Sequence, residues 1–125
     1  MKLNINQITI SVKNVEKSIE FYQKLGLNLI VKSLPKYARF ECTSGETTFS
    51  LHQSDDKINA STWIYFETET LDDDVKKLID LGIEFETLPT DESWLWREAR
   101  SKDLDENQLI LFYAGKNRKD PPWKI

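Results

Sequence analysis

One pattern of apolar residues occurs twice in the sequence, and this repeat constrains the fold more than any other feature. A strand pattern, a helix pattern and a Leu-Gly pair follow one another, and matched positions lie 56 residues apart. The matches are Ile8 with Ile64, Val15 with Leu71, Ile19 with Val75, Leu25 with Leu81, and Gly26 with Gly82. Any two strand–helix units that end in Leu-Gly look somewhat alike, but one offset that holds across strand, helix and cap favours duplication. The sequence therefore predicts two copies of one module.

Alternation and helical spacing predict the elements of the first module. Ile8, Ile10 and Val12 alternate with polar residues, which is typical of a strand with one buried face. A helix is expected between the capping residue Asn14 and Gly26, the residue type favoured just past a helix end. Further strands are expected over 27–31, 37–42 and 47–53, so the order is β-α-β-β-β.

The second module repeats this order after a polar linker over 54–61. A strand is expected over 63–67, followed by a helix in which Thr70 and Asp73 form a variant of the capping box. Gly82 ends that helix, and the remaining strands are expected over 83–87, 94–101 and 109–114. We therefore expect a single α+β domain over 1–125. It comprises a first module over about 4–53, a second over about 62–114, and a charged tail over 115–125.

Composition excludes several classes of protein. Seventeen Lys and Arg against 21 Asp and Glu give a net charge of −4, and the charges alternate, so no basic stripe for nucleic acid is present. No apolar run approaches the ~20 residues that a membrane span needs, and the first ten residues are too polar for a secretory signal. A single cysteine excludes an intrachain disulfide and fits a reducing compartment. We expect a cytoplasmic protein with no nucleic-acid or membrane partner.

Several segments carry a family resemblance. They are residues 8–22, the Leu25-Gly26-Leu27 corner, residues 71–82 and the turn over 103–107, whose sequence is close to Asp-Pro-Asp-Gly-Asn. The chain resembles the vicinal oxygen chelate superfamily, which includes glyoxalase I, bleomycin-resistance proteins, fosfomycin-resistance proteins and extradiol dioxygenases. The resemblance implies two βαβββ modules that form a curved mixed sheet around a cavity, with the helices on its outer face. In the turn, Leu104 stands where the family usually has Pro, and Glu106 stands where it usually has Gly.

The resemblance also implies a divalent metal in the cavity, bound at four positions. These positions hold Gln7, Ser50, Trp63 and Ile110 in this sequence. A metal site needs three or four good donors, but Gln7 offers a neutral amide oxygen, Ser50 is a poor ligand, and the other two cannot ligate. His52 lies two residues past Ser50 and raises the count of donors to two at most. We therefore expect no metal and no other cofactor.

Strand alternation predicts which side chains line the cavity. The first module contributes polar residues, and the second contributes mostly aromatic and apolar ones, as in many ligand pockets. The predicted ligand-binding residues are Gln7, Ser11, Ser50, His52, Trp63, Tyr65, Ile110 and Phe112, joined by Trp94, Trp96 and Glu98 if their strand face turns inward. Alternatively, these aromatic residues fill the cavity or pack in a dimer interface.

The leading functional hypothesis is metal-independent binding of a small, flat, partly aromatic or apolar molecule, as in bleomycin-resistance-type proteins. A second hypothesis is a lyase, isomerase or dioxygenase with a relocated metal on Gln7, His52 and Glu98. A third is a structural or partner-binding domain with a filled cavity. No catalytic residue is assigned, because a lone His without an evident orienting acid is more often structural; His52 and Glu98 are the candidates. We also expect a two-fold homodimer, since symmetric pairs are the commonest assembly.

Overall fold

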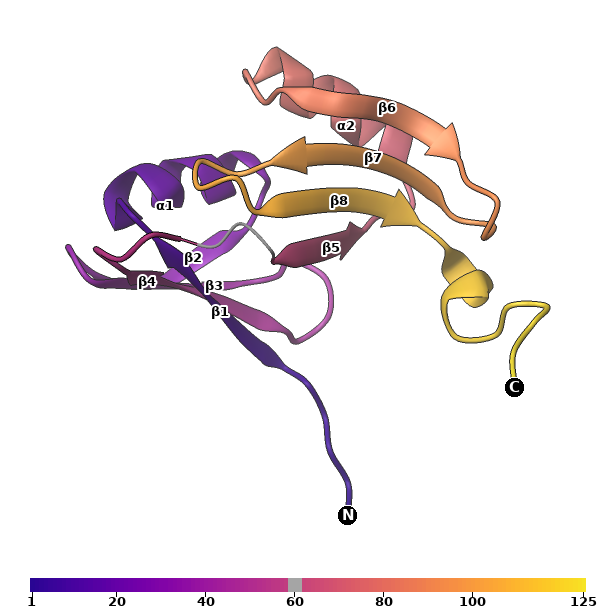
Figure 1. Ribbon diagram of the computed structural model, residues 1–125, viewed down its shortest axis with the longest axis horizontal. Coiled ribbons are helices and arrows are strands. Elements are labelled where there is room, and N and C mark those ends of the chain that lie inside the picture. The colour runs from indigo at the N-terminus through magenta and orange to yellow at the C-terminus, as the bar shows by residue number, and fades with distance from the viewer. Residues whose placement is uncertain (59–61) are drawn as a thin grey trace. The chain divides into compact units, whose positions relative to one another are not determined.

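The computed structural model describes residues 1–58 and 62–125, so the last part of the predicted linker, 59–61, lies outside the described residues. The chain divides into two compact units, residues 1–60 and 61–125. Each unit is one βαβββ module in which a helix packs on a four-stranded mixed sheet (Figure 1). The predicted α+β class and the two modules are therefore confirmed.

Unit 1 consists of β1 (Gln7–Val12), α1 (Val15–Lys24), β2 (Asn28–Ser33), β3 (Tyr37–Glu41) and β4 (Thr48–Gln53). Its strand order is β1-β4-β3-β2, with β1 parallel to β4 and the other pairs antiparallel. The buried face of α1 packs on the sheet through Tyr22, whose ring centroid lies 4.9 Å from that of Phe49. Ile10 and Val12 are buried as the alternation predicts, whereas Ile8 at the start of β1 is exposed.

Unit 2 repeats this topology. It consists of β5 (Trp63–Glu67), α2 (Leu71–Asp80), β6 (Phe85–Asp91), β7 (Arg97–Lys102), β8 (Gln108–Tyr113) and the 3₁₀ helix η1 (Gly115–Arg118). The strand order β5-β8-β7-β6 matches that of unit 1 position for position, again with one parallel pair, β5 and β8. Ile64, Leu109 and Leu111 are buried on the side of the sheet that α2 covers.

The duplication extends to the hydrogen bonds that end the two helices. Gly26 and Gly82 both have φ of 93°, the left-handed region that glycine adopts without strain. The amide of Leu27 donates to the carbonyl of Tyr22 at 3.2 Å, and the amide of Ile83 donates to that of Leu78 at 3.0 Å. Both helices therefore end in the same Schellman motif. Among the described residues, neither helix has the length and apolar content to cross a membrane.

The helix N-termini differ from each other. Asn14 caps α1 as predicted, because its side-chain oxygen accepts a hydrogen bond from the amide of Lys17 at 3.0 Å. The capping box predicted for Thr70 and Asp73 is wrong, since Thr70 caps no backbone amide. Its hydroxyl instead donates to the carboxylate of Asp74 at 3.0 Å, as does that of Thr68 at 2.5 Å. A capping side chain accepts from a backbone amide and usually has β-region backbone, whereas Thr70 has ψ of 46° and its hydroxyl is held toward Asp74 by a charge-assisted bond.

Two predicted strands of unit 2 have different bounds. β6 continues to Asp91 through Pro89, which is tolerated because β6 is an edge strand. β7 begins at Arg97 rather than at residue 94. The residues between them form a tight turn, in which the amide of Glu92 donates to the carbonyl of Trp96 at 2.8 Å and Leu95 has φ of 66°.

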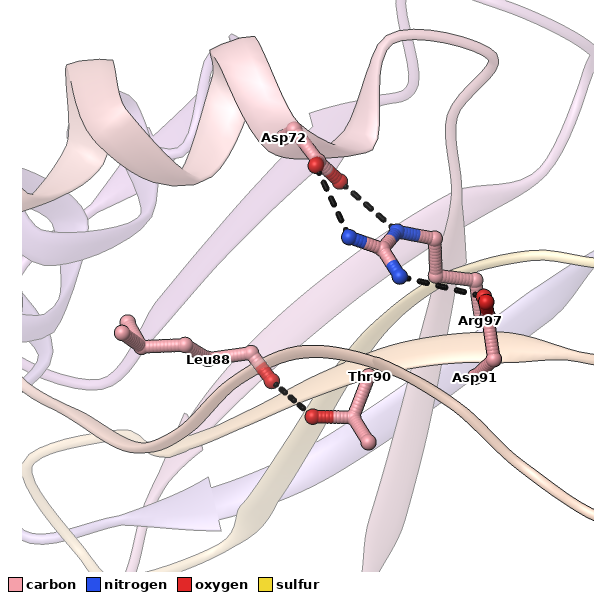
Figure 2. A network of polar contacts seen from close by, with 5 residues as sticks. All are labelled: Asp72, Leu88, Thr90, Asp91 and Arg97. Atoms are coloured by element: carbon pink, nitrogen blue, oxygen red, sulfur yellow. Dashed lines mark hydrogen bonds and ion pairs between the residues drawn. The ribbon is translucent and has the colours of Figure 1, made fainter.

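Arg97 ties α2 to the β6–β7 hairpin (Figure 2). Its Nε and Nη2 donate to the two carboxylate oxygens of Asp72, each at 2.9 Å, and Nη1 donates to Asp91 at 3.0 Å. The hydrogen bond from Arg97 holds the pKa of Asp72 below its ordinary value. This bidentate contact fixes the helix start against the sheet edge.

Candidate functional site

The face of the unit 2 sheet opposite α2 carries five of the predicted ligand-binding residues. β5 places Trp63 and Tyr65 on this face, and register pairs Tyr65 with Ile110 of β8. β8 in turn pairs with β7, which brings Arg100 beside Ile110 and Glu98 beside Phe112. We call this surface the Trp63 face, defined by Trp63, Tyr65, Ile110, Phe112, Glu98 and Arg100.

Three rings pack together on the Trp63 face. Trp96 stacks on Phe112 with centroids 4.6 Å apart and an interplanar angle of 17°. Tyr65 meets both rings edge-on, with centroids 6.1 Å from Trp96 and 5.7 Å from Phe112. Ile110 and Phe112 are buried, and the indole N–H of Trp96 donates to the carbonyl of Asn117 at 3.3 Å. The inner rings thus form a packed floor, while Tyr65 remains 45% exposed.

A buried carboxylate lies beside this floor. Glu98 is only 3% exposed, and both of its oxygens are engaged. Oε1 accepts the indole N–H of Trp94 at 3.0 Å, and Oε2 accepts Nη2 of Arg100 at 3.3 Å. The guanidinium of Arg100 in turn lies over the ring of Trp63, with Cζ 5.4 Å from the ring centroid. Glu98 is therefore held as an ion-paired anchor for Arg100, and the turn brings Trp94 to it as a hydrogen-bond donor.

The predicted polar residues of unit 1 form a network around a buried hydroxyl. Ser50 is fully buried in β4; its Oγ accepts Nε2 of Gln7 at 2.8 Å and shares a hydrogen bond of 2.7 Å with the hydroxyl of Tyr37. The side-chain oxygen of Gln7 accepts the hydroxyl of Thr48. Arg39 completes the network, since its Nε donates to the hydroxyl of Tyr37 at 2.9 Å.

Tyr37 and Arg39 were not predicted as site residues. Partial burial raises the pKa of Tyr37, but the hydrogen bonds from Ser50 and Arg39, with the Arg39 charge, outweigh it and hold the pKa below its ordinary value. Alternation in β3 was the available signal. Ala38 and Phe40 are buried on one face, so Tyr37 and Arg39 lie on the other, where register pairs Arg39 with Ser50.

His52 and Ser11 lie further along the same strands. They are neighbours in register across β1 and β4, and both are exposed. Within the described residues, no hydrogen bond or ion pair orients the imidazole of His52. Among the described residues, this candidate catalytic residue therefore has no acid that fixes its tautomer, in contrast to the oriented bases of known catalytic sites.

The donor set does not fit the divalent metal that the family resemblance implies. Gln7 already uses its amide oxygen as an acceptor, the buried hydroxyl of Ser50 already bonds to two neighbours, and Ile110 is a buried hydrocarbon. Trp63 offers an indole and not a donor lone pair. In the ranges that the structure describes, no group of three His, Cys, Asp or Glu side chains gathers in a way that could hold a metal ion.

A hollow of about 310 Å³ lies elsewhere in unit 2, at the start of α2. Its walls include Asp72, Arg97 and Tyr113, and none of the predicted site residues. Arg97 and Asp72 are already paired with each other, so this hollow offers a guest little that is unpaired, and we do not place the site there.

Comparisons with known proteins agree with this fold. A glyoxalase/bleomycin resistance protein/dioxygenase from Nocardioides is 20% identical with a TM-score of 0.81, over 100% of this chain and 91% of that chain. A member of the same superfamily from Sphaerobacter thermophilus is 22% identical with a TM-score of 0.74, over 90% of this chain and 98% of that one. An integron cassette protein from V. cholerae is 20% identical with a TM-score of 0.74, over 90% and 97%. At such identities these structures are evidence for the fold alone.

A comparison with curated proteins found no significant match. The profile of the Glyoxalase/Bleomycin resistance protein/Dioxygenase superfamily, in contrast, matches residues 4–111 and so spans both modules. The chain therefore belongs to the glyoxalase/bleomycin resistance protein/dioxygenase superfamily.

Proposed function

We propose that the protein binds a small, flat, partly aromatic molecule on the Trp63 face without a metal. The observation that carries this proposal is the state of Trp63, which is 53% exposed at a position where the resemblance implies a metal ligand. An indole left open beside a packed aromatic floor is an apolar surface that a planar guest can cover. The polar groups around it give such a guest its orientation.

The expected affinity follows from the size of these surfaces. Stacking on one ring contributes roughly 0.5–1.5 kcal/mol beyond the area term. Burial of the guest's ring, which is about the size of an aromatic side chain, adds on the order of 2–3 kcal/mol of favourable free energy. Association costs several kcal/mol, so we expect micromolar affinity and not nanomolar affinity.

The relocated metal site of the second hypothesis is not favoured by the contacts of its members. Both oxygens of Glu98 are engaged, the amide oxygen of Gln7 is engaged, and His52 has no orienting partner among the described residues. The stacking of Trp96 on Phe112 agrees with the third hypothesis, a filled cavity, for those two rings only. The exposure of Trp63 and Tyr65 supports the binding hypothesis over the filled one.

The test compares two tryptophan variants with a neutral probe, 2-naphthamide. Trp63→Ala removes the proposed stacking surface, and Trp123→Ala is the matched control because Trp123 is 56% exposed in the C-terminal tail. Calorimetric titration should show binding weakened about tenfold or more by Trp63→Ala and unchanged by Trp123→Ala. Equal affinity of Trp63→Ala and the parent would reject the assignment of the site to this face.

A further inference from the structure

We infer that the molecule bound on the Trp63 face is an aromatic carboxylate, whose ring stacks on Trp63 and whose carboxylate is held by Arg100. This inference rests on the proposed function and narrows it from a flat molecule to an anionic one.

The available groups on the face are hydrogen-bond donors. Glu98 accepts from Trp94 with one oxygen and from Arg100 with the other, so this carboxylate offers a guest no open oxygen. The Arg100 guanidinium has five N–H donors. In the part of the chain that the structure describes, it makes one side-chain hydrogen bond, through Nη2. The Arg100 side chain is 34% exposed, so its remaining donors are open to a ligand that supplies acceptors.

Two other acids near this face are engaged as well, and one of them is Glu86, whose Oε1 lies 3.7 Å from Nζ of Lys102. Oε2 of Glu67 accepts the amides of Ala114 and Gly115, each at 2.9 Å, and Oε1 lies 3.4 Å from Nε of Arg118. Among the described residues of this face, a cationic guest would therefore meet the guanidinium of Arg100 and carboxylates that are already paired. An anion meets the opposite arrangement, because a planar guanidinium binds a carboxylate with two parallel hydrogen bonds.

The geometry joins the charge to the ring surface. The guanidinium lies 5.4 Å from the centroid of Trp63, so the charge and the exposed indole are within the span of one small molecule. In an aromatic carboxylate the anionic group is bonded directly to the ring and lies near its plane. Because the guanidinium already lies over the indole, such a ligand covers the exposed ring surface that Arg100 leaves open and places its in-plane carboxylate against the edge of the guanidinium. Neither a neutral hydrocarbon nor an aliphatic acid supplies both contacts.

The experiment compares three probes that share one ring system: 2-naphthoate, 2-naphthamide and 2-naphthylmethylammonium. Calorimetric titration of the parent protein should show 2-naphthoate binding about tenfold or more tightly than the amide, with the ammonium weakest. Arg100→Met should remove the preference for the carboxylate. Lys102→Met, which removes a positive charge two residues along the same strand, should keep it, and Arg100→Lys should retain part of it because the charge stays while the planar fork is lost.

Each outcome decides a different claim. If the amide or the ammonium binds as tightly as 2-naphthoate, the anionic ligand is wrong, while binding of flat molecules still stands. If no probe binds at millimolar concentration, both the inference and the proposed function are wrong. The comparison of probes on the parent protein does not depend on the folding of any variant.

Discussion

Replacing Glu106 with glycine should raise the free energy of unfolding. Glu106 lies in the β7–β8 turn with φ of 67°, a left-handed conformation at a position where the family usually has Gly. A left-handed conformation costs a residue with a Cβ roughly 1–2 kcal/mol of folding free energy. Glycine avoids this cost, but its more flexible unfolded chain lowers the free energy of unfolding by about 0.5–1 kcal/mol. The rest of the turn is independent of the Glu106 side chain, because Asp103 accepts the amides of Asp105 and Asn107 at 2.9 Å each. The net gain should be about 0.5–1 kcal/mol.

The matched control changes a glycine in the opposite direction. Gly82→Ala places a Cβ at φ of 93° in open space, with nothing within 4 Å, so its effect is the backbone term alone. In urea denaturation, Gly82→Ala should lower the free energy of unfolding by about 1 kcal/mol, and Glu106→Gly should raise it. The slope of the free energy against urea concentration should stay unchanged in both variants. A lower denaturation midpoint for Glu106→Gly would mean that the carboxylate stabilises the turn and that the backbone argument is wrong.

Three further predictions concern the two side-chain networks and the assembly. Tyr37 should ionise below the other tyrosines in an ultraviolet titration, and Ser50→Ala or Arg39→Ala should raise its pKa toward the ordinary value; an unchanged pKa would reject the network. The pKa of Tyr37 is lower in the folded protein than in the unfolded chain. Its ionisation therefore stabilises the fold only as the pH rises from the folded pKa toward about 10, and it contributes nothing at neutral pH. Glu98→Ala should lower the free energy of unfolding by about 1 kcal/mol, because the indole N–H of Trp94 and Nη2 of Arg100 lose their acceptor, and Glu98→Gln should cost less, as measured by thermal unfolding. We also propose a two-fold homodimer, which light scattering at micromolar concentration tests and a monomeric mass would reject.

The parts of the fold that local chemistry controls were predictable from the sequence. Asn14 caps its helix, Gly26 and Gly82 end theirs, and strand alternation separates buried from open positions. These signals depend on residues that are neighbours in the chain, so no knowledge of long-range pairing is needed.

The predictions that failed, and the site residues that were missed, depend on pairing or on unusual backbone. Leu95 adopts a left-handed conformation in the turn before β7, so β7 begins later than predicted. The sequence does not reveal this turn, because leucine stands where a turn of this kind usually has glycine. The contact of Tyr37 with Ser50 depends on the register between β3 and β4, which the sequence alone does not reveal. Trp94 was expected on a strand, yet it reaches Glu98 from the turn.

The central claim is that binding occurs on the Trp63 face and needs no metal. The most direct test is a titration of chelator-treated protein with 2-naphthoate, in parallel with protein given Zn²⁺ or Ni²⁺, followed by calorimetry and by the indole N–H signals of the four tryptophans. We predict saturable binding of equal affinity in both samples, with the Trp63 signal shifting and the Trp123 signal constant. Binding that appears only after metal is restored, or that leaves the Trp63 signal in place, would contradict the account.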